Sequence, residues 1–359
     1  MMTEPVTTPG HAPAEARDLD TADQPRHGSG AFPTLRARAR YATLMTILLG
    51  TSIGLGFLHL AWDNPLPVGS EGFWLIADLR ATSLIAMLIV AICQATATIS
   101  FQTVTNNRII TPSIMGFESL YVAIQTFMVY TFGIAGVTMI VGGWQFVGMI
   151  AAMVGLSLIL YGWLLAGKYG NLQIMLLIGI IIGGGLGSVS TFMQRLLTPS
   201  EFDVLTAQLF GNISNADKAY FPIAIPLAGA ACLGLWLSSR RLNVMALGRE
   251  SAINLGINHK RATITMLIMV SVLMAVSTAL VGPMTFFGFL VATMTYQMAD
   301  TFDHRRVFPM AVLLGFTILS GAYFVMRNIF YAQGVVSILI EMVGGTVFLI
   351  VILRKGRLL

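Results

Sequence analysis

Three polar side chains lie within or near long apolar runs and are the first residues whose chemistry needs an explanation: Glu118, Gln125 and Glu341. An ionised side chain near the middle of a membrane-spanning helix costs about 2.5 to 3.5 kcal/mol, so such groups are expected in a helix interface or a cavity. Two interpretations stay open: these residues form hydrogen bonds between helices, or they line a translocation path. Because carboxylates repel anions, an anionic cargo would make a path along Glu118 and Glu341 less suitable.

No other set of side chains in the sequence is typical of catalysis or metal binding. The five histidines are scattered, and Cys93 and Cys232 stand far apart in apolar runs, so the sequence has neither a metal-ligand spacing nor a Ser-His-Asp arrangement. The nucleotide-binding pattern G-x-x-x-x-G-K-[ST] is also missing. We therefore expect no catalytic residue, no metal site and no cofactor bound by this chain.

The elements that must position these residues are membrane-spanning helices. The chain has 359 residues, of which 56% are hydrophobic and only 10% are charged. Roughly 20 apolar residues cross the hydrocarbon core as a helix, and a single span has no other way to satisfy its backbone hydrogen bonds. The sequence therefore predicts an all-α integral membrane protein with about ten transmembrane helices. The predicted spans are 41–60, 81–104, 113–132, 145–167, 171–194, 221–239, 262–281, 286–299, 308–326 and 334–353.

Charge and composition divide the chain and orient it. Residues 1–35 are rich in Thr, Pro, Ala, Asp and Gly without apolar periodicity, which predicts a disordered tail, whereas residues 36–359 form the transmembrane domain. Of the 21 Lys and Arg residues, all but four fall on the side of the tail. The positive-inside rule then places both termini in the cytoplasm. Since this topology accounts for the net charge of +5, we expect no nucleic-acid partner. The four basic residues on the outer side are Arg80, Arg195, Lys218 and Arg327.

The segment "GIIIGGGLG" places Gly179, Gly183 and Gly187 at every fourth position. On a helix this spacing gives one face without side chains, on which a neighbouring helix packs closely. Helix packing is the interpretation that we favour, and a glycine-lined substrate path is the alternative.

A polar connector, "RRLNVMALGRESAINLGINHKR" (residues 240–261), separates the sixth and seventh predicted spans. Gly248 and Gly256 are suited to end or join short helices. Two short helices on the membrane surface would offer a mixed apolar and charged face to another protein. A contact between this basic loop and anionic lipid is the alternative.

The part "ALGRESAINLGI" resembles the cytoplasmic coupling segment of the iron-siderophore and cobalamin permease family of bacterial ABC importers, whose pattern is A-L-G-[DE]-E-x-A-x-x-L-G. Arg249 stands where an acidic residue is common. In that family the segment presses into a groove of the ATPase subunit, so the resemblance gives the connector the role of an ATPase-coupling loop. The matching residues are Ala246, Leu247, Gly248, Glu250, Ala252, Leu255 and Gly256.

Other blocks resemble the same family in the same order. They are "VGPMTFFGFLV" (281–291), "DHRRVFP" (303–309) and the closing helix at 334–356. Arg80, Gln102, Asn107, Pro112 and Gly116 also stand at spacings similar to those of the family. The chain departs from the family pattern at "ATMTYQ" (292–297), where Pro-His is frequent, and at Ser83 and Arg108. These departures resemble the ferric-siderophore permeases that pair with a second, non-identical permease.

The resemblance implies a type II ABC importer permease fold and ATP-driven import of a ferric siderophore across the cytoplasmic membrane of a bacterium. It also implies a separate ATPase subunit that binds ATP and Mg, a substrate-binding lipoprotein, and a second permease in a heterodimer, with a homodimer left open. Arg80 and Arg327 would dock the binding protein, although both also suit the role of membrane-interface anchors. The alternative function is an ion-coupled secondary transporter that uses Glu118 and Glu341.

Overall fold

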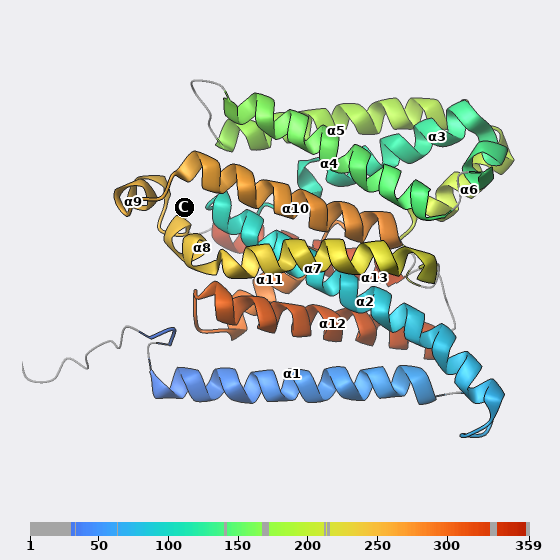
Figure 1. Ribbon diagram of the computed structural model, residues 1–359, viewed down its shortest axis with the longest axis horizontal. Helices are drawn as coiled ribbons and strands as arrows, with labels where there is room; N and C mark the ends of the chain where they lie inside the picture. The colour runs from blue at the N-terminus through green and yellow to red at the C-terminus, as the bar shows by residue number, and fades with distance from the viewer. Residues whose placement is uncertain are drawn as a thin grey trace, which may run out of the picture.

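The computed structural model describes residues 30–356 except 33, 63, 140–141, 167–171, 212, 214–215 and 331–335. The described residues form helices and no strand, and most of the helices run along one long axis (Figure 1). The α-helices are α1 (Leu35–Ala61), α2 (Glu71–Val104), α3 (Phe117–Met139), α4 (Gly143–Ala166), α5 (Leu172–Gln194), α6 (Pro199–Leu209), α7 (Phe221–Leu237), α8 (Ser239–Met245), α9 (Arg249–Asn254), α10 (His259–Val281), α11 (Phe287–Met298), α12 (His304–Asn328) and α13 (Val336–Gly356). Two 3-10 helices are η1 (Ser113–Met115) and η3 (Lys218–Tyr220).

A helix covers each of the ten predicted apolar runs, and within the described residues six are long and apolar enough to cross a membrane. The six segments are Leu35–Ala61, Glu71–Val104, Ile174–Gln194, Lys218–Leu237, His259–Val281 and His304–Asn328. The run at 286–299, which was expected to span the membrane or nearly so, carries the short helix α11 of 12 residues, about 18 Å long. This helix follows a non-helical turn at Gly282.

Helix α6 is an element that the apolar pattern did not predict. Its signal is local: Thr198 and Glu201 form a capping box, with Pro199 at the first helical position. Glu201 accepts a hydrogen bond from the backbone N–H of Thr198 at 2.9 Å, and this bond holds the pKa of the Glu201 carboxyl below its usual value. The short helix lies at the end of the bundle opposite α9 (Figure 1).

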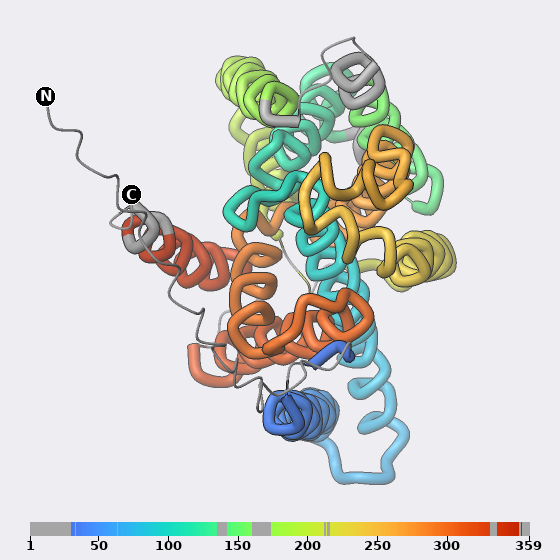
Figure 2. The backbone as a smooth tube through the Cα atoms, turned by 90° about the vertical axis from the view of Figure 1, so that its left-hand side faces the viewer, coloured from blue at the N-terminus to red at the C-terminus, as the bar shows by residue number. Residues whose placement is uncertain are grey.

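Helices α2 and α10 form the centre of the bundle. They pack against each other, α2 also packs on α12, and α10 also packs on α4 and α7. Helix α11 also approaches α2 closely, because Gly288 has no side chain: a Cβ there would lie 2.2 Å from Thr98 Oγ1 of α2. Seen from the end that carries α8 and α9, α1 and α13 lie at the periphery and α5 lies on the side away from α1 (Figure 2).

Helix α1 is fastened to α12 by polar contacts along its length, although most of its surface is exposed. Helix α1 supplies two hydroxyl groups and an imidazole, and α12 supplies two backbone oxygens and a hydroxyl group, so these polar groups have partners in an apolar setting. The contacts are Tyr41 Oη to Arg306 O, Ser52 Oγ to Thr317 Oγ1, and His59 Nε2 to Ser320 O, each 2.9 Å long.

The end of the bundle that carries α8 and α9 is called the connector end below, and the end that carries α6 and η3 is called the far end. Helix α1 begins at the connector end and α13 ends there (Figure 1). The placement of both termini in the cytoplasm stays a prediction. Most of the predicted tail, residues 1–29, lies outside the described residues, but Ala31 and Phe32 contact Thr301 and Tyr41.

Candidate functional site

The connector folds into two short helices that project from one end of the bundle (Figure 1). Gly248 joins α8 to α9 at a φ of +95°, and Gly256 leads into α10 at a φ of +82°. Such angles are readily adopted only by glycine. The backbone N–H of Gly248 donates to Met245 O at 3.0 Å, and that of Gly256 donates to Ile253 O at 2.9 Å, so each glycine closes the helix before it.

The side chains of the coupling pattern divide into a supporting residue and an exposed face. Ala252 of α9 is completely buried, whereas Leu247 is 63% exposed and Leu255 is 62% exposed. Ala246, Glu250 and Gly256 are also exposed, and Gly248 is half-buried. The connector thus presents large apolar side chains away from the bundle, a feature typical of a protein interaction site.

The connector is tied to two transmembrane helices through one buried histidine. Asn243 of α8 accepts hydrogen bonds from the backbone N–H and Nδ1 of His304, at 3.0 and 2.6 Å, and donates to Asp303 Oδ1 at 2.8 Å. On its other side, His304 Nε2 lies 2.8 Å from Thr103 Oγ1 of α2. Sequence reasoning noticed the Asp-His-Arg block but assigned no role to it, because its partners are 61 and 201 residues away.

At the far end the structure changes the interpretation of Arg80. Its side chain is only 9% exposed, and Nη1 donates hydrogen bonds to Trp62 O at 2.6 Å and to His59 O at 3.4 Å. The guanidinium therefore caps the carbonyl end of α1, where a cation is favoured by the helix dipole. The burial of Arg80 argues against the predicted contact with a docking protein, since its guanidinium faces the end of α1. Arg327 is half-buried beside the same His59.

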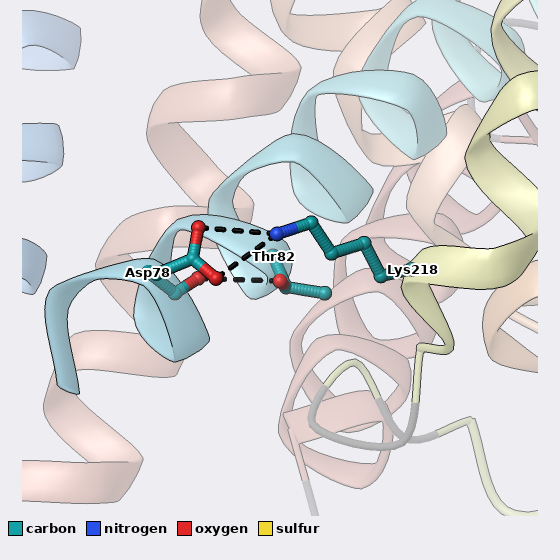
Figure 3. Close-up of polar contacts among 3 residues, drawn as sticks. All are labelled: Asp78, Thr82 and Lys218. Atoms are coloured by element: carbon teal, nitrogen blue, oxygen red, sulfur yellow. Dashed lines mark hydrogen bonds and ion pairs between the residues drawn. The ribbon is translucent and has the colours of Figure 1, made fainter. Parts of the chain in front are cut away.

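At the far end, a surface ion pair joins η3 to α2. Lys218 Nζ lies 2.9 Å from Asp78 Oδ2, and Thr82 Oγ1 donates to the backbone oxygen of Asp78 at 3.2 Å (Figure 3). Both charged side chains are exposed, so a pair of this kind contributes about 0.2 to 1 kcal/mol. The contact links η3 to α2, whereas the sequence presented Lys218 only as an outer cation.

The three glycines of α5 have different surroundings. A Cβ on Gly183 would lie 2.9 Å from Gly116 Cα, and a Cβ on Gly179 would lie 3.1 Å from Met115 O. These two glycines therefore admit the turn at Met115 and Gly116 and the start of α3, which packs on α5. A Cβ on Gly187 would meet nothing within 4 Å, and this glycine lines a cavity.

Glu118 and Glu341 lie together, and Gln125 lies apart from them. Thr285 Oγ1 donates to Glu118 Oε2, and Glu341 lies beside the same threonine. Both carboxylates line a cavity of about 440 Å³. Gln125 lines a separate cavity of about 250 Å³, where its Nε2 donates to Tyr121 Oη at 3.3 Å. Among the described residues, no three His, Cys, Asp or Glu side chains are close enough to hold a metal ion.

Residues 43–354, most of the chain, match the sequence profile of the FecCD transport family. The chain belongs to the FecCD transport family. This FecCD chain is 48% identical over 330 residues to the petrobactin import system permease protein FatC of Bacillus anthracis, with 92% of this chain and 93% of FatC covered. It is 33% identical over 296 residues to the petrobactin import system permease protein YclO of Bacillus subtilis (strain 168), with 82% and 90% covered.

Bacillus anthracis also has the petrobactin import system permease protein FatD. This chain is 23% identical to FatD over 319 residues, with 88% of this chain and 91% of FatD covered. Among solved structures, a metal-chelate type ABC transporter in an inward-facing conformation matches with a TM-score of 0.72 and 18% identity, covering 88% of this chain and 99% of that one. The likeness confirms the all-helical importer permease fold.

These findings confirm that this FecCD chain is a multi-pass membrane permease subunit of an ABC importer. The curated relatives are transport subunits and not enzymes. The alternative of an ion-coupled secondary transporter therefore receives no support from them.

Proposed function

We propose that this permease carries a ferric siderophore, with petrobactin or a chelate of similar chemistry as the cargo. The observation that carries this proposal is the 48% identity to FatC across 92% of the chain. At the lower identity of 33%, YclO has petrobactin import in its name as well, so the same cargo is named at two levels of similarity.

The working unit of this proposal is a complex with a second, non-identical permease. FatC and FatD are both permeases of a petrobactin import system, and this chain is 48% identical to the first and only 23% identical to the second. That difference supports a heterodimer in which this chain takes the place of FatC. A homodimer is the second possibility.

In this proposal a separate ATPase subunit, with its own ATP and Mg, docks on the exposed face of the connector. The face offers Leu247 and Leu255 as apolar anchors, and Glu250 is a charged neighbour. Because Asn243 joins the connector to His304 and Thr103, a displacement of the connector is passed to α12 and α2. Rocking of packed helices around a fixed path is a standard form of alternating access.

A substrate-binding lipoprotein delivers the chelate at the far end in this proposal. Arg327 remains the candidate for an ion pair with it, while Arg80 is occupied at the end of α1. Such a pair would act mainly on the association rate and would be sensitive to salt.

The test is reconstitution of this chain with its partner permease and ATPase in liposomes, with the binding protein supplied at the outer face. We expect ATP-dependent uptake of ⁵⁵Fe presented as ferric petrobactin, and little uptake of ferric enterobactin. Equal uptake of both chelates would remove the cargo assignment. Uptake without ATP would remove the importer mechanism.

A further inference from the structure

The cavity that holds Glu118 and Glu341 has features of a binding site that go beyond helix packing. It lies between α3, α5, α13 and the two non-helical segments at residues 210–211 and 283–285. Glu118 is only 8% exposed, and no donor meets its Oε1 with hydrogen-bond geometry, although Ser113 and the backbone of Met284 lie close to the carboxylate. A buried carboxylate oxygen without a donor is costly, so the site lacks a group that would complete it.

Glycine turns build this cavity from distant parts of the chain. Gly116, at a φ of +100°, starts α3 so that Glu118 follows within one turn. Gly282, at a φ of +88°, ends α10 and presses on Gly211, and Thr285 follows in the same non-helical segment. The carboxylate and the threonine are therefore fixed by backbone geometry, which favours a preorganised site over a chance void.

The polar groups that line the cavity are mostly acceptors or are uncharged. The only hydrogen of the Thr285 hydroxyl is already donated to Glu118 Oε2. Glu341 is the second carboxylate, and it lies close enough to Glu118 for the two to interact electrostatically. No Lys or Arg occurs among the described residues that line the cavity. The remaining polar lining consists of Ser119, Thr191, Gln194 and Ser337.

We propose that this cavity binds a cationic hydrogen-bond donor, namely a protonated amine carried by the cargo. The inference rests on the proposed function, because it names the part of the chelate that the permease itself recognises. An ammonium group supplies the missing donor to Glu118 Oε1 and balances the carboxylate pair. A cavity of about 440 Å³ is much larger than a bare cation needs, and an anionic group would be repelled.

The first test measures the charge preference of the cavity without any cargo. Ser119 lines the cavity, so Ser119→Cys places a thiol beside Glu118. The variant is made in a Cys232→Ala background within the complete transporter complex, and Cys93 stays because it is fully buried. The thiol is reacted with a cationic trimethylammonium-ethyl methanethiosulfonate and with its anionic sulfonatoethyl counterpart. Ser188→Cys, on the exposed side of α5 outside this cavity, is the control, and it is combined with Arg195→Gln because Arg195 lines the same hollow as Ser188.

We expect the ratio of cationic to anionic reaction rates to be at least about tenfold higher at Ser119→Cys than at the control, because a low-dielectric cleft concentrates counter-ions. The isosteric pair Glu118→Gln and Glu341→Gln should abolish that excess and leave the control ratio unchanged. Ser337→Cys probes the same cavity from α13 if the first thiol disturbs folding. An equal ratio at all sites, or two cavity thiols that react with neither reagent, would overturn the proposal.

The second test uses the cargo. A ferric chelate with a pendant primary amine and the same chelate with that amine acetylated are compared for ATP-driven uptake. The Glu118→Gln, Glu341→Gln variant should reduce uptake of the amine form about tenfold and leave uptake of the acetylated form nearly unchanged. Loss of all ferric chelate uptake by the unmodified complex would contradict the proposed function, whereas uptake indifferent to both the amine and the glutamates would contradict only this inference.

Discussion

Asn243 Oδ1 lies 2.6 Å from His304 Nδ1, so a residue of the connector is hydrogen-bonded to the first residue of α12. Since an amide oxygen only accepts, the histidine carries its hydrogen on Nδ1. His304 is buried, and its Nε2 faces Thr103 near the end of α2. One imidazole therefore joins the surface on which we place the ATPase to two helices of the bundle.

Replacing Asn243 by Ala should uncouple ATP hydrolysis from import. The exposed connector face stays intact, but His304 loses its partner, at a cost of about 1 to 3 kcal/mol for a buried unsatisfied group. We expect the ATP hydrolysed per chelate imported to rise several-fold in liposomes. The control is Asn254→Ala at the exposed end of α9. A proportional fall in hydrolysis and import would show that Asn243 has a purely structural role.

Replacing Leu247 by Asp should weaken binding of the ATPase subunit. The side chain is 63% exposed in the isolated chain, so the melting temperature of the permease should hardly change. A buried apolar anchor at an interface contributes about 2 kcal/mol or more, which corresponds to roughly 30-fold in dissociation constant. Affinity is measured with purified subunits in detergent. Unchanged affinity at both Leu247→Asp and Leu255→Asp would argue for the lipid-contact interpretation of the connector.

Replacing Ala252, a buried residue of the same connector, by Leu should affect folding of the connector. Ala252 is completely buried, so Ala252→Leu should overpack the space under α9 and destabilise the connector by about 1 to 3 kcal/mol. We expect increased proteolysis between α8 and α10 together with loss of ATPase binding. Intact protease resistance with full binding would mean that α9 tolerates displacement from the bundle.

Replacing Gly116 by Ala should destabilise the fold much more than replacing Gly187 by Ala. Gly116 has a φ of +100°, and its Cβ would lie 3.1 Å from Gly183 Cα, whereas a Cβ on Gly187 would meet nothing within 4 Å. Strained backbone of this kind costs on the order of 1 to 3 kcal/mol. Thermal unfolding of the two purified variants checks the difference. Equal melting temperatures would contradict the described packing of α3 on α5.

Arg80 and Arg327 should respond differently to substitution by Ala. Arg80→Ala removes the cation that caps α1 and should lower the melting temperature, because a hydrogen bond to a charged group contributes about 1.5 to 3 kcal/mol. Arg327→Ala should leave stability nearly unchanged and reduce the affinity for the binding protein at low ionic strength. Affinity loss in Arg80→Ala without a change in melting temperature would restore the docking interpretation of that residue.

The sequence predicted the helices well because apolar runs are a strong local signal. Each of the ten runs carries a helix, and Gly248 and Gly256 mark the ends of α8 and α9 as expected. The pattern did not reveal that the chain turns at Gly282 before the short helix α11. It missed α6, whose signal is the capping residue pair and not hydrophobic periodicity.

Contacts between residues far apart could not be predicted from one sequence. The hydrogen bond between Thr285 and Glu118 joins residues 167 positions apart, and only the fold brings Glu341 to them. Arg80 looked like an exposed cation because its acceptors are backbone oxygens, which have no sequence signature. Its burial thus depends on tertiary packing alone.

The polar contacts between α1 and α12 are distributed over the whole length of the pair, from Tyr41 to His59. Sliding one helix past the other would break every contact at once, whereas tilting the pair together breaks none. The two helices should therefore move together as one rigid body. A spin-label distance measured across them should stay constant through the nucleotide cycle, while distances from either helix to α5 are free to change.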